Sequence, residues 1–195
     1  MLSIQHRFLF IHIPKTGGNS VQEILLPYSM DKKVMDHKQD GIERFDLTNK
    51  ELGTNKHSRL GEYRKKLPSE LFASLFKFAT LRNPWDRMVS FYWMPYKGNI
   101  EWDRNEFRKV ILQTVPSAHL IEGGIDHLMR FEHLQEDFNQ VCDKIGIARQ
   151  QLPRRNASKH DHYSTYYDDE LIELVRQHHG CDIEYGGYEF EKVMP

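Results

Sequence analysis

Residues 7–27 read RFLFIHIPKTGGNSVQEILLP. The run at 7–13 is compact and apolar and stops at Pro14, and the residues after it change from small ones to helical spacing. This stretch therefore predicts a strand, a tight loop and a helix. We expect the helix to begin at Asn19 or Ser20 and to stop before Pro27, because the residue preceding a proline is biased away from the helical region.

The same order of elements recurs further along the chain. Residues 75–81 (LFKFATL) form a second apolar run that stops at Arg82-Asn83-Pro84, and the helix expected after it carries apolar residues close to one face. Strands that alternate with helices predict an α/β fold, with a central parallel sheet covered on both faces and ligands at the carboxyl ends of the strands.

The rest of the chain predicts further elements. We expect a single short strand within 28–55, a short helix from Ser58 to near Pro68, and a short strand at 127–131. Further helices are expected at 103–114, 132–145 and 168–179, with a basic loop at 152–163 and a Gly- and Tyr-rich tail at 180–190.

Length and charge narrow the class of protein. A chain of 195 residues with 39% apolar residues is long enough for one sizeable core, so we expect a single domain over 1–195. Lys plus Arg number 27 against 28 for Asp plus Glu. The balance gives no overall field that would attract nucleic acid or an anionic membrane, so neither is expected as a partner and any anion must be bound locally.

The cysteines and the N-terminal segment indicate the compartment. Cys142 and Cys181 are too few for a disulfide framework, lack metal-ligand spacing and suit a reducing environment. The apolar stretch at 8–13 is short, is interrupted by His12 and has no small-residue cleavage site. We therefore expect a soluble, cytoplasmic protein without a metal site.

The first loop has the chemistry of an anion site. Between the strand and the helix, residues 12–20 (HIPKTGGNS) contain two glycines, two hydroxyl residues and Lys15. Glycines allow the backbone to approach a phosphate, successive N–H groups can point at its oxygens, and the helix N-terminus adds partial positive charge. Because Lys15 precedes the glycines, the loop is not a Walker A motif. The alternative is an ordinary strand-to-helix turn with a surface lysine.

The second loop offers a complementary set of donors. Arg82 leaves the second strand and Ser90 follows about two helical turns later. An arginine presents a planar fork of donors to a phosphate, and a hydroxyl can add another. The alternative is that Arg82 caps the sheet edge and Ser90 is a neutral helix residue. If the two loops lie at neighbouring strand ends, together they can hold two phosphates of one nucleotide.

The two motifs HIPKTGGNS (12–20) and RNPWDRMVSFY (82–92) resemble the 5′-phosphosulfate loop and the 3′-phosphate motif of sulfotransferases that use 3′-phosphoadenosine 5′-phosphosulfate (PAPS). The resemblance is to the carbohydrate branch, with the heparan sulfate 2-O and chondroitin 4-O sulfotransferases, and to its short bacterial members. It continues through LMRFEHLQEDF (128–138), RNASKHDHYSTYYDDEL (155–171) and CDIEYGGYEF (181–190). It implies a P-loop NTPase-like three-layer sandwich with a central parallel sheet.

The resemblance also implies which residues bind the donor. Lys15 and the backbone that follows it would hold the 5′-phosphosulfate, Arg82 and Ser90 would hold the 3′-phosphate, and a later loop would close over the nucleotide. Asn19 stands where relatives commonly carry threonine or serine. The donor-binding residues implied in this way are Lys15, Thr16, Gly17, Gly18, Asn19, Ser20, Arg82, Ser90, Arg155, Asn156 and Ser158.

The implied reaction moves a sulfuryl group from PAPS to an acceptor hydroxyl and leaves 3′-phosphoadenosine 5′-phosphate (PAP), without a metal. Lys15 is expected to neutralise charge on the leaving oxygen. A histidine suits the general base, since its ordinary pKa is about 6.5. Relatives have a base histidine at the place of His57, which makes it the first candidate, with His37 as the alternate and Glu62 as a third.

The acceptor is less defined than the donor. We expect a glycan or a glycosylated small molecule; the sulfated position and the oligomeric state stay open. The basic cluster Arg59, Arg64, Lys65 and Lys66 could receive an anionic glycan or form a solvated helix face. Trp85 and Tyr92 could stack on adenine or pack in the core. Two other functions compete: a P-loop-type kinase of a small metabolite, which needs a lysine after glycine and acidic residues for magnesium, and a non-catalytic relative that binds PAP or a glycan.

Overall fold

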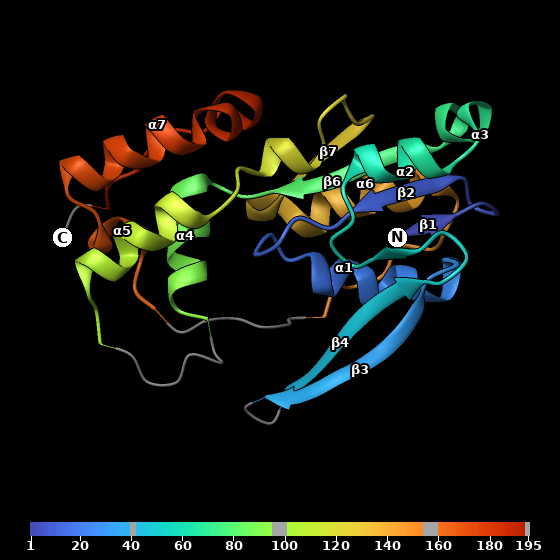
Figure 1. Cartoon of the computed structure of the whole chain (residues 1–195), viewed down its shortest axis with the longest axis horizontal. Coiled ribbons are helices and arrows are strands. Elements are labelled where there is room, and N and C mark those ends of the chain that lie inside the picture. Colours follow the sequence, from blue (N-terminus) through green and yellow to red (C-terminus); the bar gives the residue numbers. More distant parts are fainter. Residues whose placement is uncertain (40–41, 95–100, 154–159, 194–195) are drawn as a thin grey trace.

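A computed structural model describes residues 1–39, 42–94, 101–153 and 160–193, with the side chains of 35–39 and 42–45 excepted. The main sheet has the order β1-β2-β6-β7 (Figure 1), formed by Leu2–Ser3, Phe8–Ile11, Phe76–Leu81 and His127–Arg130. Strands β2, β6 and β7 are parallel, and the short β1 runs antiparallel to β2. The predicted parallel sheet is confirmed.

Helices cover both faces of this sheet. Residues along β2 alternate between two cores: Phe8 and Phe10 belong to one, Leu9 and Ile11 to the other, and all four are fully buried. The first core is closed by α1 (Gly18–Leu25) and α6 (Leu134–Ile145). The second is closed by α2 (Leu60–Lys66), α3 (Ser69–Ser74), α4 (Pro84–Tyr92), α5 (Arg104–Gln113) and α7 (Asp169–Gly186). The arrangement is the predicted three-layer α/β sandwich.

Local signals explain where the helices begin. The Asn83 side chain accepts hydrogen bonds from the backbone N–H groups of Trp85 (3.0 Å) and Asp86 (3.4 Å), which caps α4. Asp103 caps α5 in the same way. Short 3₁₀ helices complete the described chain at Leu26–Tyr28 (η1), Ser117–Leu120 (η3), Phe131–His133 (η4) and Tyr163–Tyr166 (η5).

The segment 28–55 differs from its prediction. Instead of one short strand it forms β3 (Lys32–Gln39), β4 (Ile42–Asn49) and β5 (Thr54–Asn55), an antiparallel sheet of its own. The β3–β4 hairpin projects away from the main body (Figure 1). A projecting hairpin needs few apolar residues, and among its described side chains Leu47 belongs to a buried core. The prediction was wrong because this pairing leaves little hydrophobic pattern in the sequence.

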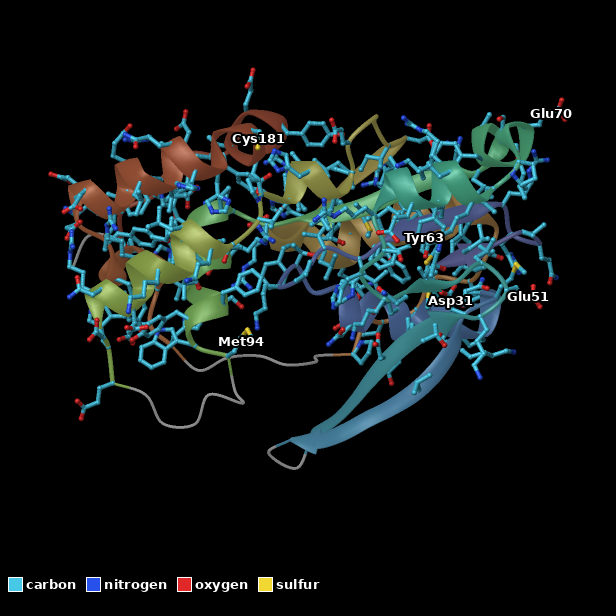
Figure 2. All side chains as sticks on the ribbon, viewed as in Figure 1. Asp31, Glu51, Tyr63, Glu70, Met94 and Cys181 are labelled. Carbon is cyan, nitrogen blue, oxygen red and sulfur yellow. The ribbon has the colours of Figure 1, made fainter. Side chains whose placement is uncertain are left out.

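Asp31, just before β3, attaches the second sheet to the first. Its carboxylate accepts a hydrogen bond from the Leu2 backbone N–H at 2.8 Å, and the residue is 4% exposed. Figure 2 labels Asp31 below Tyr63, a residue of α2 whose phenol interacts with the Asp31 charge. Burial, with a further contribution from the Asp31 charge, raises the pKa of the Tyr63 phenol.

The C-terminal helix is longer than predicted. The sequence indicated an end near His179 and a tail from Gly180, whereas α7 runs to Gly186 with a kink at His179 (φ −120°). The glycine that ends the helix is Gly187, in the left-handed region at φ 60°. The prediction of a tail over 180–186 was therefore wrong, and α3 was missed entirely.

None of the helices in the described ranges combines the length and apolar character that a bilayer crossing requires.

Candidate functional site

The two loops singled out by their sequences lie against each other at the carboxyl ends of the neighbouring strands β2 and β6 (Figure 1). The Nη1 of Arg82 donates a hydrogen bond to the Lys15 carbonyl oxygen at 3.2 Å. Five residues further on, Nε of Arg87 donates to the Pro14 carbonyl oxygen at 3.1 Å. The expected juxtaposition of the loops is therefore present.

The first loop has an unusual backbone. Lys15 has a φ of 69° and Gly17 a φ of 77°, and the former is uncommon for a residue with a side chain. The fully buried Thr16 hydroxyl donates to the Ile13 carbonyl oxygen at 2.8 Å. The Thr16 side chain thus stabilises the turn, and the backbone N–H of Thr16 is the group that it offers as a candidate anion donor. Left-handed residues in a short loop are typical of backbone anion sites.

Glycine is required at both positions that begin α1. At Gly18 a Cβ atom would lie 2.1 Å from Cδ2 of His12, and at Gly17 it would lie 2.7 Å from a Leu134 methyl carbon. Gly17 is the N-cap of α1 and supplies no side-chain hydrogen bond to the first turn. The first amides of a helix with such a cap, together with the helix dipole, favour an anion at this end.

Arg82 is oriented by the protein before any ligand arrives. Its Nε donates to Asp86 at 2.7 Å, and its guanidinium lies 4.1 Å above the Phe131 ring centre. Within the described part of the chain, its hydrogen bonds use two of the five N–H donors that an arginine carries. Ser90 is 3% exposed and lies two turns along the same segment. Donors therefore remain for an anion beside the first loop.

Arg87, which the sequence prediction overlooked, connects this site to the C-terminal helix. It is 1% exposed, lies 3.7 Å from the Asp182 carboxylate and donates to the Val115 carbonyl oxygen at 3.2 Å. Burial is the main cause that lowers its pKa to about 10, with Arg82 acting in the same direction and Asp182 opposing it. The guanidinium is therefore protonated at neutral pH. Its place in the RNPWDR motif was the available signal, but the sequence does not show burial.

Asp182 has the hydrogen-bond partners that a buried carboxylate needs. Its two oxygens accept from the backbone N–H groups of Ser117 and Ala118, each at 2.7 Å. Burial on its own raises the pKa of this carboxyl group. His179, the two amides and Arg87 outweigh that effect and lower the pKa below its usual value. The ion pair, with 3.7 Å between Arg87 and the Asp182 carboxylate, is thus a buried link between α4 and α7.

His57 lies in the loop between β5 and α2. Its backbone N–H donates to Asn55 Oδ1 at 2.9 Å, and its ring centre is 4.9 Å from that of His12. Partial burial and the Lys56 charge lower the pKa of His57, while a hydrogen bond to the main chain of His12 and the charge of Asp46 partly oppose them. The imidazole is therefore largely neutral near pH 7, the form that can accept a proton.

The other base candidates are placed differently. Glu62 accepts hydrogen bonds from Ser58 Oγ at 3.0 Å and from the Arg59 backbone N–H at 2.9 Å, so it serves to cap α2. The His37 side chain lies outside the described residues. The donor-loop candidates Arg155, Asn156 and Ser158 also lie outside them.

Several further side chains have structural roles. Trp85 Nε1 donates to the Ile172 carbonyl oxygen at 3.2 Å, and Tyr92 is buried beside Phe107, so both belong to the core. In the basic cluster, Arg64 and Lys66 donate to the carbonyl oxygens of Gly123 (3.0 Å) and Gly53 (2.5 Å). Among the described residues, no three His, Cys, Asp or Glu side chains gather in a way that would hold a metal ion.

The sheet and loops define an α/β protein with a candidate anion site at two adjacent strand ends. The chain belongs to the sulfotransferase family, since residues 1–118 match the model of the Sulfotransferase family. It is 26% identical to carbohydrate sulfotransferase 10 of Danio rerio over 93% of this chain and 45% of that protein, so it spans less than half of that relative. The crystal structure of a sulfotransferase from Alicyclobacillus acidocaldarius covers 71% of this chain and 61% of its own, with 11% identity and a TM-score of 0.35.

We expect Arg87→Met to lower the free energy of unfolding by about 3–5 kcal/mol, because it leaves the buried Asp182 carboxylate without its charge partner. Urea denaturation followed by circular dichroism measures this change. In the double variant Arg87→Met/Asp182→Asn the loss should be smaller than the sum of the two single losses.

The matched control is Arg104→Met, which breaks an exposed pair of ion contacts with Asp168 and Glu170 and should leave the urea midpoint nearly unchanged. Equal midpoints for the Arg87 and Arg104 variants would contradict a buried link between α4 and α7.

Proposed function

We propose that this chain transfers a sulfuryl group from PAPS to a hydroxyl group of an acceptor and releases PAP. Membership of the sulfotransferase family supports sulfuryl transfer. The observation that carries the choice of donor is the hydrogen bond between Arg82 and the Lys15 carbonyl, because it brings two sets of anion-binding groups to one place. A nucleotide with separate 5′ and 3′ phosphate groups has the two anions that such a site can take.

The residues of the two loops fit this ligand. Lys15 and the backbone amides of 16–20 would hold the 5′-phosphosulfate, and Arg82 with Ser90 would hold the 3′-phosphate. The Asn19 side chain has a buried oxygen atom without a hydrogen-bond partner among the described residues. Since the two ends of an amide can be exchanged by a flip, Asn19 can offer a donor to a phosphate oxygen. Arg155, Asn156 and Ser158 are proposed to close over the nucleotide.

PAPS supplies the activated sulfuryl group. As the acceptor oxygen bonds to sulfur, the bond from sulfur to the 5′-phosphate oxygen breaks, and its electron pair stays on PAP. His57 accepts the acceptor proton, and Lys15 offsets the charge that develops on the leaving oxygen. In-line positioning and charge stabilisation are the main requirements of such transfers. We propose that no metal takes part.

We propose a carbohydrate as the acceptor, either a glycan or a glycosylated small molecule. The support is the similarity to carbohydrate sulfotransferase 10 along most of this chain. His57 is an exposed residue next to the hairpin sheet, so an acceptor would approach it from the side of β4 and β5. The two unpaired cysteines, Cys142 and Cys181, support a reducing compartment, and we propose the cytoplasm.

PAP should stabilise the protein in the absence of magnesium, by about 2.7 kcal/mol at a hundred times its Kd. AMP, which lacks the 3′-phosphate, should stabilise it less at equal concentration, and Arg82→Met should reduce the response to PAP to that of AMP. Thermal shift assays with PAP, AMP and magnesium-ATP measure these differences. A larger response to magnesium-ATP than to PAP would favour the kinase.

We expect Lys15→Ala to lower turnover on the order of 10²–10³-fold, as removal of a group that stabilises transition-state charge does. The Kd for PAP should rise much less. Alanine has the same strain as lysine at a positive φ, so the loop itself should persist. Single-turnover transfer of radiolabelled sulfate and calorimetric PAP binding separate the two effects. Near-normal turnover would remove Lys15 from the proposed chemistry.

Replacing the base, His57→Ala, should reduce transfer by about 10²–10⁴-fold with PAP binding retained. Because the pKa of His57 is lowered, the rate of transfer by the unmodified protein should rise with pH and then level off. The midpoint of this rise should lie below the ordinary histidine pKa of about 6.5. His119→Ala is the control, since this exposed histidine lies in η3. An active His57→Ala enzyme would direct attention to His37, and an inactive unmodified enzyme that binds PAP would favour the non-catalytic relative.

A further inference from the structure

His12 is in contact with both parts of the proposed transfer site. It follows β2 directly and is 5% exposed. Its ring lies 4.9 Å from the His57 ring at an interplanar angle of 32°. Its Cδ2 edge lies so close to Gly18 that a Cβ atom there would come within 2.1 Å. One side chain thus separates the candidate base from the loop that would hold the phosphosulfate.

The environment of His12 leaves one of its ring nitrogens without a hydrogen-bond partner in the described part of the chain. Its Nδ1 atom is buried and has no hydrogen-bond partner among the described residues. A buried polar atom in that state destabilises the fold, whereas an apolar side chain of similar size would not. The ring of histidine is the smallest aromatic one, and the space against Gly18 is tight. These observations favour a role for His12 in the site.

The contact between the two rings suits a positioning role. Their centres lie 4.9 Å apart at an interplanar angle of 32°, and His12 Nδ1 makes no hydrogen bond to His57 or to any other described residue. A direct relay needs a hydrogen bond between ring nitrogens. The contact between the rings can instead fix the orientation of the His57 ring and shield part of it from water.

We propose that His12 is a positioning residue, whose ring holds the His57 imidazole in a fixed place beside the phosphosulfate loop. The proposal rests on the function proposed above, in which His57 is the base. Gly18 contributes to this positioning, because the absence of a Cβ atom at Gly18 leaves room for the His12 ring.

Burial and the charges around the pair keep both rings neutral near pH 7. Burial is the main cause that lowers the pKa of His12, and the charges of His57, Lys56 and the amino group of Met1 act in the same direction. For His57, burial and Lys56 lower the pKa, whereas the main chain of His12 and Asp46 raise it. Removal of the His12 ring would hydrate His57 more fully, so the pKa of His57 should rise toward about 6.5.

The first experiment follows the His57 imidazole by NMR titration in the protein without substrate. In His12→Ala its pKa should rise, and the acid limb of the kcat/KM profile should move to higher pH by the same interval. PAP binding should change less than threefold. His119→Ala is the matched control and should leave the His57 titration where it was. An unchanged His57 titration in a folded His12→Ala protein would overturn the proposal.

The second experiment is a double-mutant cycle between His12 and Gly18. Gly18→Ala alone should displace the His12 ring and shift the His57 titration, because the new Cβ has no space. In the His12→Ala background the same change should have at most a small effect, since the ring that it would meet is gone. Equal effects of Gly18→Ala in both backgrounds would overturn the proposal.

These readouts separate the two proposals. Should His57→Ala be active, the role of His57 as base would fail, yet the NMR titrations would still report whether His12 positions its ring. Should the titrations fail to respond, the positioning role would be lost even in an enzyme that depends on His57.

Discussion

Two arginines of one segment bind two consecutive carbonyl groups of the first loop, and the site depends on this double contact. Arg82 binds the carbonyl oxygen of Lys15, and Arg87 binds that of Pro14. A loop with a positive φ at Lys15 is conformationally costly and persists when its surroundings hold it. Both guanidinium groups are almost completely buried, so water competes little for these carbonyl oxygens. The loop geometry is therefore set by the second strand end as much as by its own glycines.

The same contact extends the site to the end of the chain. Arg87 pairs with Asp182 in α7, whose carboxylate also holds the start of η3 through the amides of Ser117 and Ala118. Asp182 lies beyond residues 1–118, which match the family model. The kink at His179 begins the part of α7 that carries Asp182, and His179 is itself buried. The C-terminal helix thus supports the first loop indirectly. Asp182 pairs with Arg87, and Arg87 in turn donates a hydrogen bond to the Pro14 carbonyl oxygen.

The sequence predicted the elements whose signals are local. Each strand–loop–helix unit has an apolar run, a break and helical spacing within about 20 residues, and the structure has both units where they were expected. The β3–β4 hairpin was missed because it projects from the core and has little apolar alternation. Gly180 looked like a helix end although Gly187 adopts the left-handed conformation. Arg87 and His12 were missed for a third reason: their importance comes from burial and from partners distant in sequence, which a pattern does not contain.

The described groups around the loops are held in place before a ligand binds. Arg82 is fixed by Asp86, the Lys15 carbonyl and the Phe131 ring, and the His57 ring rests on His12. Ordering of side chains on binding costs affinity, and a group ordered during folding avoids that cost. In the proposed reaction it would also keep charge stabilisation aligned with the reacting atoms, without rearrangement at the moment of transfer. This arrangement lowers the stability of the fold at two places, because the Lys15 backbone is strained and a ring nitrogen of His12 has no hydrogen-bond partner among the described residues. Selection for stability alone would remove both features.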